Sequence, residues 1–413
     1  MTGSKESTET YAWVIIIVLF AAQMVMSMGA YAWGPLAPFF REEFGVSRAE
    51  IGLITSALYV TAVIVAIPSG MLVDRIGARV MLVFCIAIMA VSFIVMPFVN
   101  KFFFVIVCAA VGGIGYGMIN QVSTKGLMHW FTSKTRATAM GIKQSGVTLG
   151  AAVSAVLLPV LTVTCSWKLS LFVVGIVMLI TAFLSFVFYK EHPEGDVSSI
   201  SIVGAGGKNP EMSLLKILSD PTLFAAILIL PLMAFNQICI ASFLVLYLTE
   251  ELNFSIGMAG SCLTAAMVAG TAGRVGWGVI SDRVFKGDRL KPSFFLTIIG
   301  AACAFCLAVL PDHAPIFFYI LLSGLIGFTL IGWNALLMTL IAELAGTERA
   351  GSVMGIGITV AWAGIIAGPP VFGYIADSLN YFTGWMLVSF SALFSALSFV
   401  YISLRRGKSE KPE

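Results

Sequence analysis

Charged side chains are scarce in this chain of 413 residues: Asp, Glu, Lys and Arg make up only 11% of it, whereas apolar residues make up 59%. A soluble globular protein is about a quarter charged and half apolar, so the composition excludes an ordinary soluble domain. The apolar residues are too many for one buried core. They read instead as repeated segments of about 20 residues, each able to cross a lipid bilayer. We therefore expect a membrane-embedded chain with no nucleic-acid partner.

Histidine is also rare, and the groups that build metal and catalytic sites do not cluster. The close pair Cys303 and Cys306 has no second pair and no nearby histidine, which favours buried structural thiols over a metal site or a disulfide framework. No paired carboxylates, nucleophile–base pair or phosphate-binding loop occurs at membrane depth. We expect no enzyme activity, no cofactor and no metal. The histidines are His129, His192 and His313, and the other cysteines are Cys85, Cys108, Cys165, Cys239 and Cys262.

The long apolar runs predict twelve membrane-spanning helices. The first eleven residues are polar and the next apolar run lasts a full span, which predicts a first transmembrane helix and no cleaved signal peptide. Proline and glycine are expected to mark ends and bends at Gly34-Pro35, Pro159, Pro231 and Pro369-Pro370. The spans are 12–39, 48–72, 78–98, 101–131, 134–163, 167–189, 221–250, 256–281, 292–310, 314–342, 350–376 and 381–404.

The longest polar stretch, 190–220, divides the chain near its midpoint. It predicts a cytoplasmic linker between two six-helix bundles, 1–189 and 221–413. With both termini inside, 17 of the 24 Lys and Arg residues fall in inner segments and four in outer loops. This bias predicts a multi-pass protein of the inner (plasma) membrane with both termini cytoplasmic. We expect it to be a monomer.

One motif recurs at the same place in both halves. Gly70–Arg79 follows the second span and Gly278–Lys286 follows the eighth, and both contain Gly-x-x-x-Asp-Arg, 208 residues apart. A second pair of segments, which begin at Arg136 and at Arg349, resemble each other; they open spans five and eleven and lie 213 residues apart. A glycine permits close helix approach, and an aspartate at a helix end accepts hydrogen bonds from arginine and from a neighbouring helix N-terminus. The repetition favours a cytoplasmic gate over a merely solvated loop. The gate residues are Gly70, Asp74, Arg75, Gly77, Arg79, Arg136, Asp282, Arg283 and Arg349.

Through these motifs and its six-linker-six layout, the chain resembles the major facilitator superfamily over essentially its whole length. The resemblance implies two bundles related by a pseudo-two-fold axis, which rock around a site near the membrane midplane. It also implies that Asp74 engages the start of the eleventh span, near Arg349. The second copy departs from the family pattern because Gly287 is displaced and is followed by Asp288. The stretch Tyr31–Ile51 further resembles the first loop of the monocarboxylate transporters and oxalate/formate exchangers.

Arg274 lies about seven residues before the cytoplasmic end of the eighth span, which places it roughly a third to halfway into the membrane from that side. Its charge costs on the order of 3 kcal/mol or more at the centre of a bilayer, so it requires a partner. The spans carry their carboxylates only near helix ends, so we predict that the partner is a substrate carboxylate, held in a bidentate fork. The alternative is that Arg274 extends towards the cytoplasm or caps backbone carbonyls.

In the monocarboxylate transporters and oxalate/formate exchangers, an arginine on this helix contacts the substrate, and Arg274 aligns with that arginine. Two positions differ from those groups. Gly270 replaces the aspartate that many monocarboxylate carriers have one turn earlier, and 359–364 lacks the lysine by which oxalate exchangers hold a dianion. A single fixed cation in the second half favours a monoanion.

Two lysines inside the first half allow more than one interpretation. Lys125 either extends to the cytoplasm, since Trp130-Phe131 resembles an interfacial helix end, or lines the inner cavity. Lys143 lies about nine residues into span five, where Gly146 and Gly150 predict close helix packing. Either lysine is a candidate for the coupling proton or for a second anion contact. If both face the cavity with Arg274, a dianion becomes feasible.

Polar and aromatic residues at mid-depth complete the predicted substrate site. An isolated Trp or Tyr in a span usually packs or faces lipid, but these lie near the midplane and several occur with an amide nearby. Besides Arg274, the candidates at this depth are Tyr116, Asn120, Gln144, Asn236, Gln237, Trp333, Asn334 and Trp362, and Tyr31 in the outer half of span one is a further candidate.

The function predicted is secondary transport of a small organic anion, with a monocarboxylate favoured, by alternating access with proton symport or anion exchange. One alternative is an exporter of hydrophobic or drug-like compounds, although such antiporters usually hold a mid-span acidic residue. Another is a dicarboxylate or sulfonate carrier. A non-transporting receptor is disfavoured because it would not need the loop motif twice.

Overall fold

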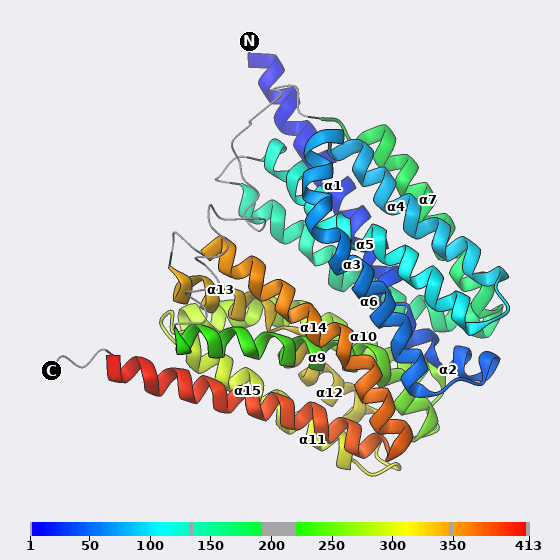
Figure 1. Cartoon of the computed structure of the whole chain (residues 1–413), viewed down its shortest axis with the longest axis vertical. Coiled ribbons are helices and arrows are strands. Elements are labelled where there is room, and N and C mark those ends of the chain that lie inside the picture. Colours follow the sequence, from blue (N-terminus) through cyan, green and yellow to red (C-terminus); the bar gives the residue numbers. More distant parts are fainter. Residues whose placement is uncertain (1, 132–134, 192–219, 347–349, 410–413) are drawn as a thin grey trace. The chain divides into compact units, whose positions relative to one another are not determined.

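The computed structural model describes residues 2–131, 135–191, 220–346 and 350–409, and most of the predicted linker lies outside them. The chain forms two compact units. Unit 1 is Met1–Val46 with Leu53–Ile200, and unit 2 is Ser47–Gly52 with Ser201–Glu413. Both consist of long helices (Figure 1). Twelve helical segments of the described residues are long and apolar enough to cross a membrane.

Apolar segments of this length form helices because a helix satisfies its own backbone hydrogen bonds, which lipid cannot do. Ser166, Asp220 and Ser255 begin three of the helices by accepting backbone hydrogen bonds with their side chains. Unit 1 contains most of α3 (Arg48–Ile76) and α1 (Thr2–Ala30), α2 (Trp33–Phe44), α4 (Ala78–Val95), η1 (Met96–Phe98), α5 (Phe102–Trp130), α6 (Arg136–Thr164) and α7 (Trp167–Phe188).

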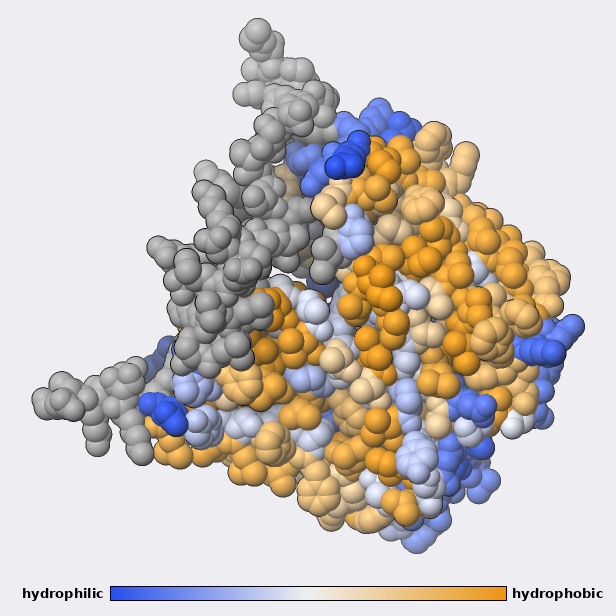
Figure 2. Space-filling view, in the orientation of Figure 1, coloured by the Kyte–Doolittle hydropathy of each residue, from blue (hydrophilic) through white to orange (hydrophobic). Residues whose placement is uncertain are grey.

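Unit 2 repeats this arrangement, and apolar side chains cover much of the visible face of both units (Figure 2). Its helices are α9 (Pro221–Glu250), α10 (Ile256–Arg283), α11 (Leu290–Val309), α12 (Ile316–Ile326), η2 (Gly327–Ile331), α13 (Asn334–Ala345), α14 (Ala350–Ser378) and α15 (Tyr381–Ser409).

Two predicted spans are not continuous α-helices. The first is interrupted at Tyr31-Ala32, and α2 then continues to Phe44. Pro35 explains this bend, predicted at Gly34-Pro35, because proline has no N–H to donate to the preceding turn. The tenth span contains the π-helical segment η2, followed by a turn at Gly332-Trp333. By contrast Pro159, Pro231 and Pro369-Pro370 all lie inside continuous helices.

Glycines bring the same pair of helices together in each unit. A methyl group built at Gly150 in α6 would lie 2.1 Å from the Met24 carbonyl oxygen in α1, and one at Gly146 would lie 2.9 Å from that of Phe20. This confirms the packing predicted for Gly146 and Gly150. In unit 2, a methyl group at Gly364 in α14 would lie 1.9 Å from the carbonyl oxygen of Pro231 in α9. Gly364 lies 214 positions after Gly150, so the internal repeat extends to backbone packing.

Replacement of Gly150 by leucine should therefore destabilise unit 1. The side chain would collide with backbone rather than with a flexible group, and overpacking of this kind costs about 3 kcal/mol. Thermal unfolding of the purified protein measures the effect. Gly141→Ala is the matched control, because Gly141 lies on the same helix and has no atom within 4 Å of an added methyl group. Equal unfolding temperatures for the two variants would contradict this packing.

Candidate functional site

The half-buried Arg274 lies where α10 crosses the π-helical segment η2. Gly273 permits the crossing, since a methyl group there would lie 2.2 Å from the carbonyl oxygen of Phe328. The same oxygen accepts a 2.9 Å hydrogen bond from the Trp277 indole nitrogen. A π-helical segment frequently occurs at functional sites, because the inserted residue changes the direction of side chains and frees a carbonyl. The Arg274 backbone is thus held between two fixed contacts.

A polar cluster lies on the following segment of unit 2. The Gln237 side-chain oxygen, from the middle of α9, accepts hydrogen bonds from Trp333 Nε1 at 3.0 Å and from Asn334 Nδ2 at 3.3 Å. Trp333 and Gln237 are buried and Asn334 is half-buried. The structure therefore brings together the predicted Trp333, Asn334 and Gln237, with Gln237 as the common partner of the other two. We refer to these three residues as the amide cluster.

Asn236 lies apart from the amide cluster despite its neighbouring position. It is fully buried, and its side-chain oxygen accepts a hydrogen bond from the Ser391 hydroxyl of α15. Its side-chain nitrogen has no partner among the described residues. This position suits helix packing rather than the substrate contact predicted for Asn236.

Three tyrosines from separate segments meet in unit 1. The Tyr59 and Tyr116 rings pack edge to face with centroids 5.6 Å apart, and the Tyr31 side chain lies close to that of Tyr59. Tyr31 and Tyr116 were predicted as site residues, whereas Tyr59 was not. Asn120, one turn from Tyr116, is half-buried.

Lys143 is buried in unit 1, with 2% of its surface exposed. Its Nζ donates to the Thr124 hydroxyl at 3.1 Å, and no carboxylate among the described residues pairs with it. Gln23 of α1, which packs beside Gly146 one turn further along α6, is also fully buried. Neither amide atom of Gln23 has a partner in the part of the chain that the structure describes. Unit 1 therefore contains a buried cation and an unsatisfied amide close in the fold.

Lys125 contacts the loop motif. Its Nζ lies 2.6 Å from Asp74 Oδ1 and donates to the Val73 carbonyl oxygen, so it binds the end of α3. Arg79 donates to the carbonyl oxygen of Phe186 and through its backbone to Glu191, which fastens α4 to the end of α7. The expected contact of Asp74 with the region of Arg349 lies outside the described residues.

The second copy of the motif uses a different ion pair. Asp282 Oδ1 lies 2.6 Å from the Arg289 guanidinium, which also binds Glu343 at 3.1 Å. Burial opposes the charge on Arg289, but its hydrogen bonds and charge interactions with Asp282 and Glu343 outweigh this effect and raise the guanidinium pKa. Gly77 and the displaced Gly287 both have positive φ, 93° and 85°, so each motif ends in a turn that favours glycine.

The remaining predicted residues show no shared cluster. A methyl group at Gly70 or Gly278 would meet no described atom within 4 Å, so the close approach expected there is absent from the described structure. Arg75, Arg283 and Gln144 are exposed, and Trp362 is half-buried. The side chain of Arg136 lies outside the described residues.

Residues 19–369 match the family model described as Major Facilitator Superfamily. The chain belongs to the Major Facilitator Superfamily. This confirms the resemblance inferred from the loop motifs, and with it the fold of twelve transmembrane helices.

Named relatives of this superfamily chain align over most of its length. It is 26% identical over 398 residues to the hexuronate transporter of Bacillus subtilis, covering 94% of this chain and 93% of that one. It is 27% identical over 357 residues to a probable sulfoacetate transporter of Cupriavidus necator, covering 83% and 82%. A bacterial homologue of the human lysosomal transporter Spinster, solved inward-facing and unoccupied, has the same fold, with a TM-score of 0.77 at 14% identity over 95% of both chains.

The groups assembled in this Major Facilitator Superfamily chain suit reversible binding. Unit 2 offers a guanidinium and an amide cluster, and unit 1 offers phenol hydroxyls and a buried ammonium. A guanidinium binds a carboxylate or sulfonate, whereas amides and phenols bind hydroxyl groups.

Proposed function

We propose that this chain is a secondary carrier for a small hydroxylated organic acid, with a monocarboxylate of sugar-acid size as the preferred substrate. The observation that carries the proposal is the presence in one unit of Arg274, beside the π-helical segment, and of the amide cluster. Arg274 binds the carboxylate, and the amide cluster binds hydroxyl groups. The hexuronate relative supports this class, since a hexuronate has one carboxylate and several hydroxyls.

Coupling is assigned to unit 1. Lys143 is a buried ammonium without a carboxylate partner among the described residues, so it is the proposed proton carrier or exchange-anion contact. Lys125, paired with Asp74, is assigned to the gate. The distribution of basic residues supports a cytoplasmic location for the loop-motif ends of the helices and for both termini. The proposed carrier is a monomer in the plasma membrane.

A sulfonate or dicarboxylate carrier is the second candidate, favoured by the sulfoacetate relative. One experiment decides between the two. The purified protein is heated with a hexuronate, the corresponding neutral hexose, lactate or sulfoacetate at several pH values, and uptake is then measured in proteoliposomes with and without a pH gradient. The proposal requires stabilisation and uptake by the hexuronate and none by the neutral hexose. Stabilisation by sulfoacetate alone favours the second candidate, and no response to any anion rejects both.

Replacement of Asn334 by leucine tests the hydroxyl contact. We expect about tenfold weaker hexuronate binding with little change for sulfoacetate, because loss of one hydrogen bond costs about 1.4 kcal/mol. Titration of each anion against the purified protein measures this. Thr339→Val, which removes an exposed hydroxyl on the same helix, should change neither affinity. Equal weakening for both anions in Asn334→Leu would indicate a general packing effect and reject the hydroxyl contact.

A further inference from the structure

Lys143 lies among polar side chains from two other helices of unit 1. Thr124 of α5 accepts a hydrogen bond from its ammonium, and Gln23 of α1 packs beside Gly146, one turn further along α6. We name Lys143, Thr124 and Gln23 the lysine cluster. We propose that the lysine cluster binds a small monovalent inorganic anion of the halide class, which neutralises the buried ammonium. This site deepens the coupling role assigned to Lys143, so it rests on the proposed function.

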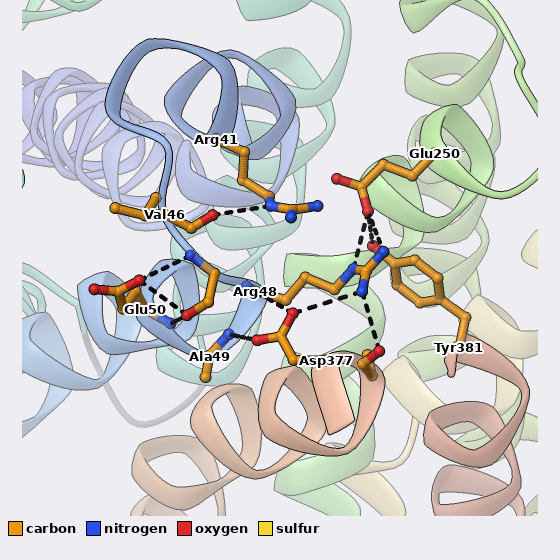
Figure 3. Close-up of polar contacts among 10 residues, drawn as sticks. Arg41, Val46, Arg48, Ala49, Glu50, Glu250, Asp377 and Tyr381 are labelled. Carbon is orange, nitrogen blue, oxygen red and sulfur yellow. Dashed lines mark hydrogen bonds and ion pairs between the residues drawn. The ribbon is translucent and has the colours of Figure 1, made fainter. Parts of the chain in front are cut away.

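Other basic side chains show how this chain satisfies a partly buried cation. The Arg48 guanidinium is held by the carboxylates of Glu250 and Asp377, which lie 2.9 Å and 3.5 Å away (Figure 3). Lys125 and Arg289 each have a carboxylate oxygen at 2.6 Å. These three basic side chains remain 21%, 16% and 17% exposed, respectively. A cation with this much access to water therefore still has an anionic partner in this fold.

Lys143 is more deeply buried than these three cations and has fewer partners. Only 2% of its surface is exposed, and none of the ion pairs among the described residues includes it. An ammonium has three N–H donors, so the Thr124 hydroxyl at 3.1 Å leaves two donors and the charge without a described partner. Burial of an ion is strongly unfavourable unless an opposite charge and hydrogen bonds offset it. An anion beside the ammonium would supply both.

Gln23 provides a second, independent indication of a ligand. Its side chain is fully buried, and neither its amide nitrogen nor its amide oxygen has a partner in the described part of the chain. A buried amide that makes no hydrogen bond loses its contacts with water without compensation. Its nitrogen carries two N–H donors, which an anion can accept.

The packing of α1 against α6 directs the Gln23 amide towards Lys143. A methyl group at Gly146 would lie 3.3 Å from the Gln23 Cβ, and Lys143 lies one turn earlier on the same face of α6. Gly146 and Gly150 approach carbonyl oxygens four positions apart on α1, so the two helices run parallel. Side chains on a helix lean towards its N-terminus, so the Gln23 amide extends towards the turn that contains Lys143.

The donors and the close packing favour a small anion over other ligands. The ammonium, the amide nitrogen and the hydroxyl all donate hydrogen bonds, and a single negative charge matches the one ammonium. The helices beside the cluster approach to backbone contact at Gly146 and Gly150, which leaves little space for an organic acid. A monatomic halide satisfies these donors with the smallest volume.

Equilibrium binding of radiolabelled chloride to the purified protein tests the site, with sulfate to hold the ionic strength constant and no organic anion present. We expect saturable binding that Lys143→Met abolishes. Gln23→Leu should weaken it about tenfold, the effect of losing one hydrogen bond to a charged group. Chloride at about a hundred times its Kd should also raise the unfolding temperature of the unmodified protein by about 5 °C, with no such rise in Lys143→Met.

Three further variants show whether the binding is specific to the lysine cluster. Lys168→Met removes a cation whose side chain is 44% exposed, and Ser145→Ala removes a hydroxyl that bonds within α6 to the Ile142 carbonyl oxygen. Both should bind chloride as the unmodified protein does. Arg274→Ala should also retain chloride binding, because Arg274 belongs to unit 2.

Three results would overturn the site. Chloride binding that is lost in Arg274→Ala and retained in Lys143→Met would place the ion at the proposed substrate contact. Equal binding in the unmodified protein, Lys143→Met and Gln23→Leu would place it elsewhere. The absence of saturable binding in the unmodified protein would mean that water alone serves the cluster. Because neither an organic acid nor uptake enters this experiment, its failure is distinguishable from failure of the carrier assignment.

Discussion

Replacement of Arg274 by alanine is expected to abolish anion binding and uptake while the protein still folds. Arg274 is half-buried beside η2 and supplies the cation that a substrate carboxylate needs at this depth. Loss of a bidentate charge-assisted contact costs about 3 kcal/mol, which corresponds to roughly a hundredfold weaker binding. Binding titration and uptake into proteoliposomes, with hexuronate as the probe, measure this effect.

Arg274→Lys separates loss of the charge from loss of the paired guanidinium donors, and Lys291→Ala serves as a control. Arg274→Lys retains the charge but not the planar pair of donors, so it should recover only a small part of the binding. Lys291→Ala removes a cation whose side chain is 70% exposed at the start of α11, and it should bind and transport normally. The unfolding temperature of Arg274→Ala should stay near that of the unmodified protein. Uptake near the unmodified rate in Arg274→Ala would reject the assignment of Arg274.

The helices and their repetition were predictable because they depend on local pattern. A run of about 20 apolar residues specifies a membrane helix by its own composition, and Gly146 and Gly150 indicate close packing by their spacing. Composition alone cannot show the π-helical segment at 327–331, because its sequence is as apolar as the helices on either side. Its signal is the pair Gly327 and Gly332, which a Cβ-bearing residue could not replace without a backbone clash.

The candidate site was predictable by residue type and depth, but its partners were not. Trp333 and Asn334 were chosen for their depth, yet their hydrogen-bond partner Gln237 lies almost a hundred residues earlier. The neighbouring Asn236 contacts α15 instead. Because α9 is apolar on all sides, its sequence pattern does not show which of two adjacent residues faces which neighbouring helix. The pairing of Lys125 with Asp74 likewise joins α5 to α3 and depends on tertiary packing.

Lys143→Met is the second change with a large expected effect: it should increase the stability of the protein and decrease its transport activity. The ammonium is buried beside one hydroxyl, that of Thr124, without a carboxylate in the described part of the chain. Burying an ion costs several kcal/mol unless it is fully paired, and methionine fills a similar volume without that cost. The variant should therefore unfold at a higher temperature, and it should lose uptake driven by a pH gradient.

Lys125→Met provides the comparison for stability, because that ammonium has a carboxylate partner 2.6 Å away. Its replacement leaves Asp74 without this ion pair and should not raise the unfolding temperature. If Lys143 served only in packing, Lys143→Met would lower the stability of the protein and retain uptake. That result would exclude Lys143 from coupling. Higher stability together with lost uptake would mean that the chain retains a destabilising buried cation for transport, since nothing in its packing requires one.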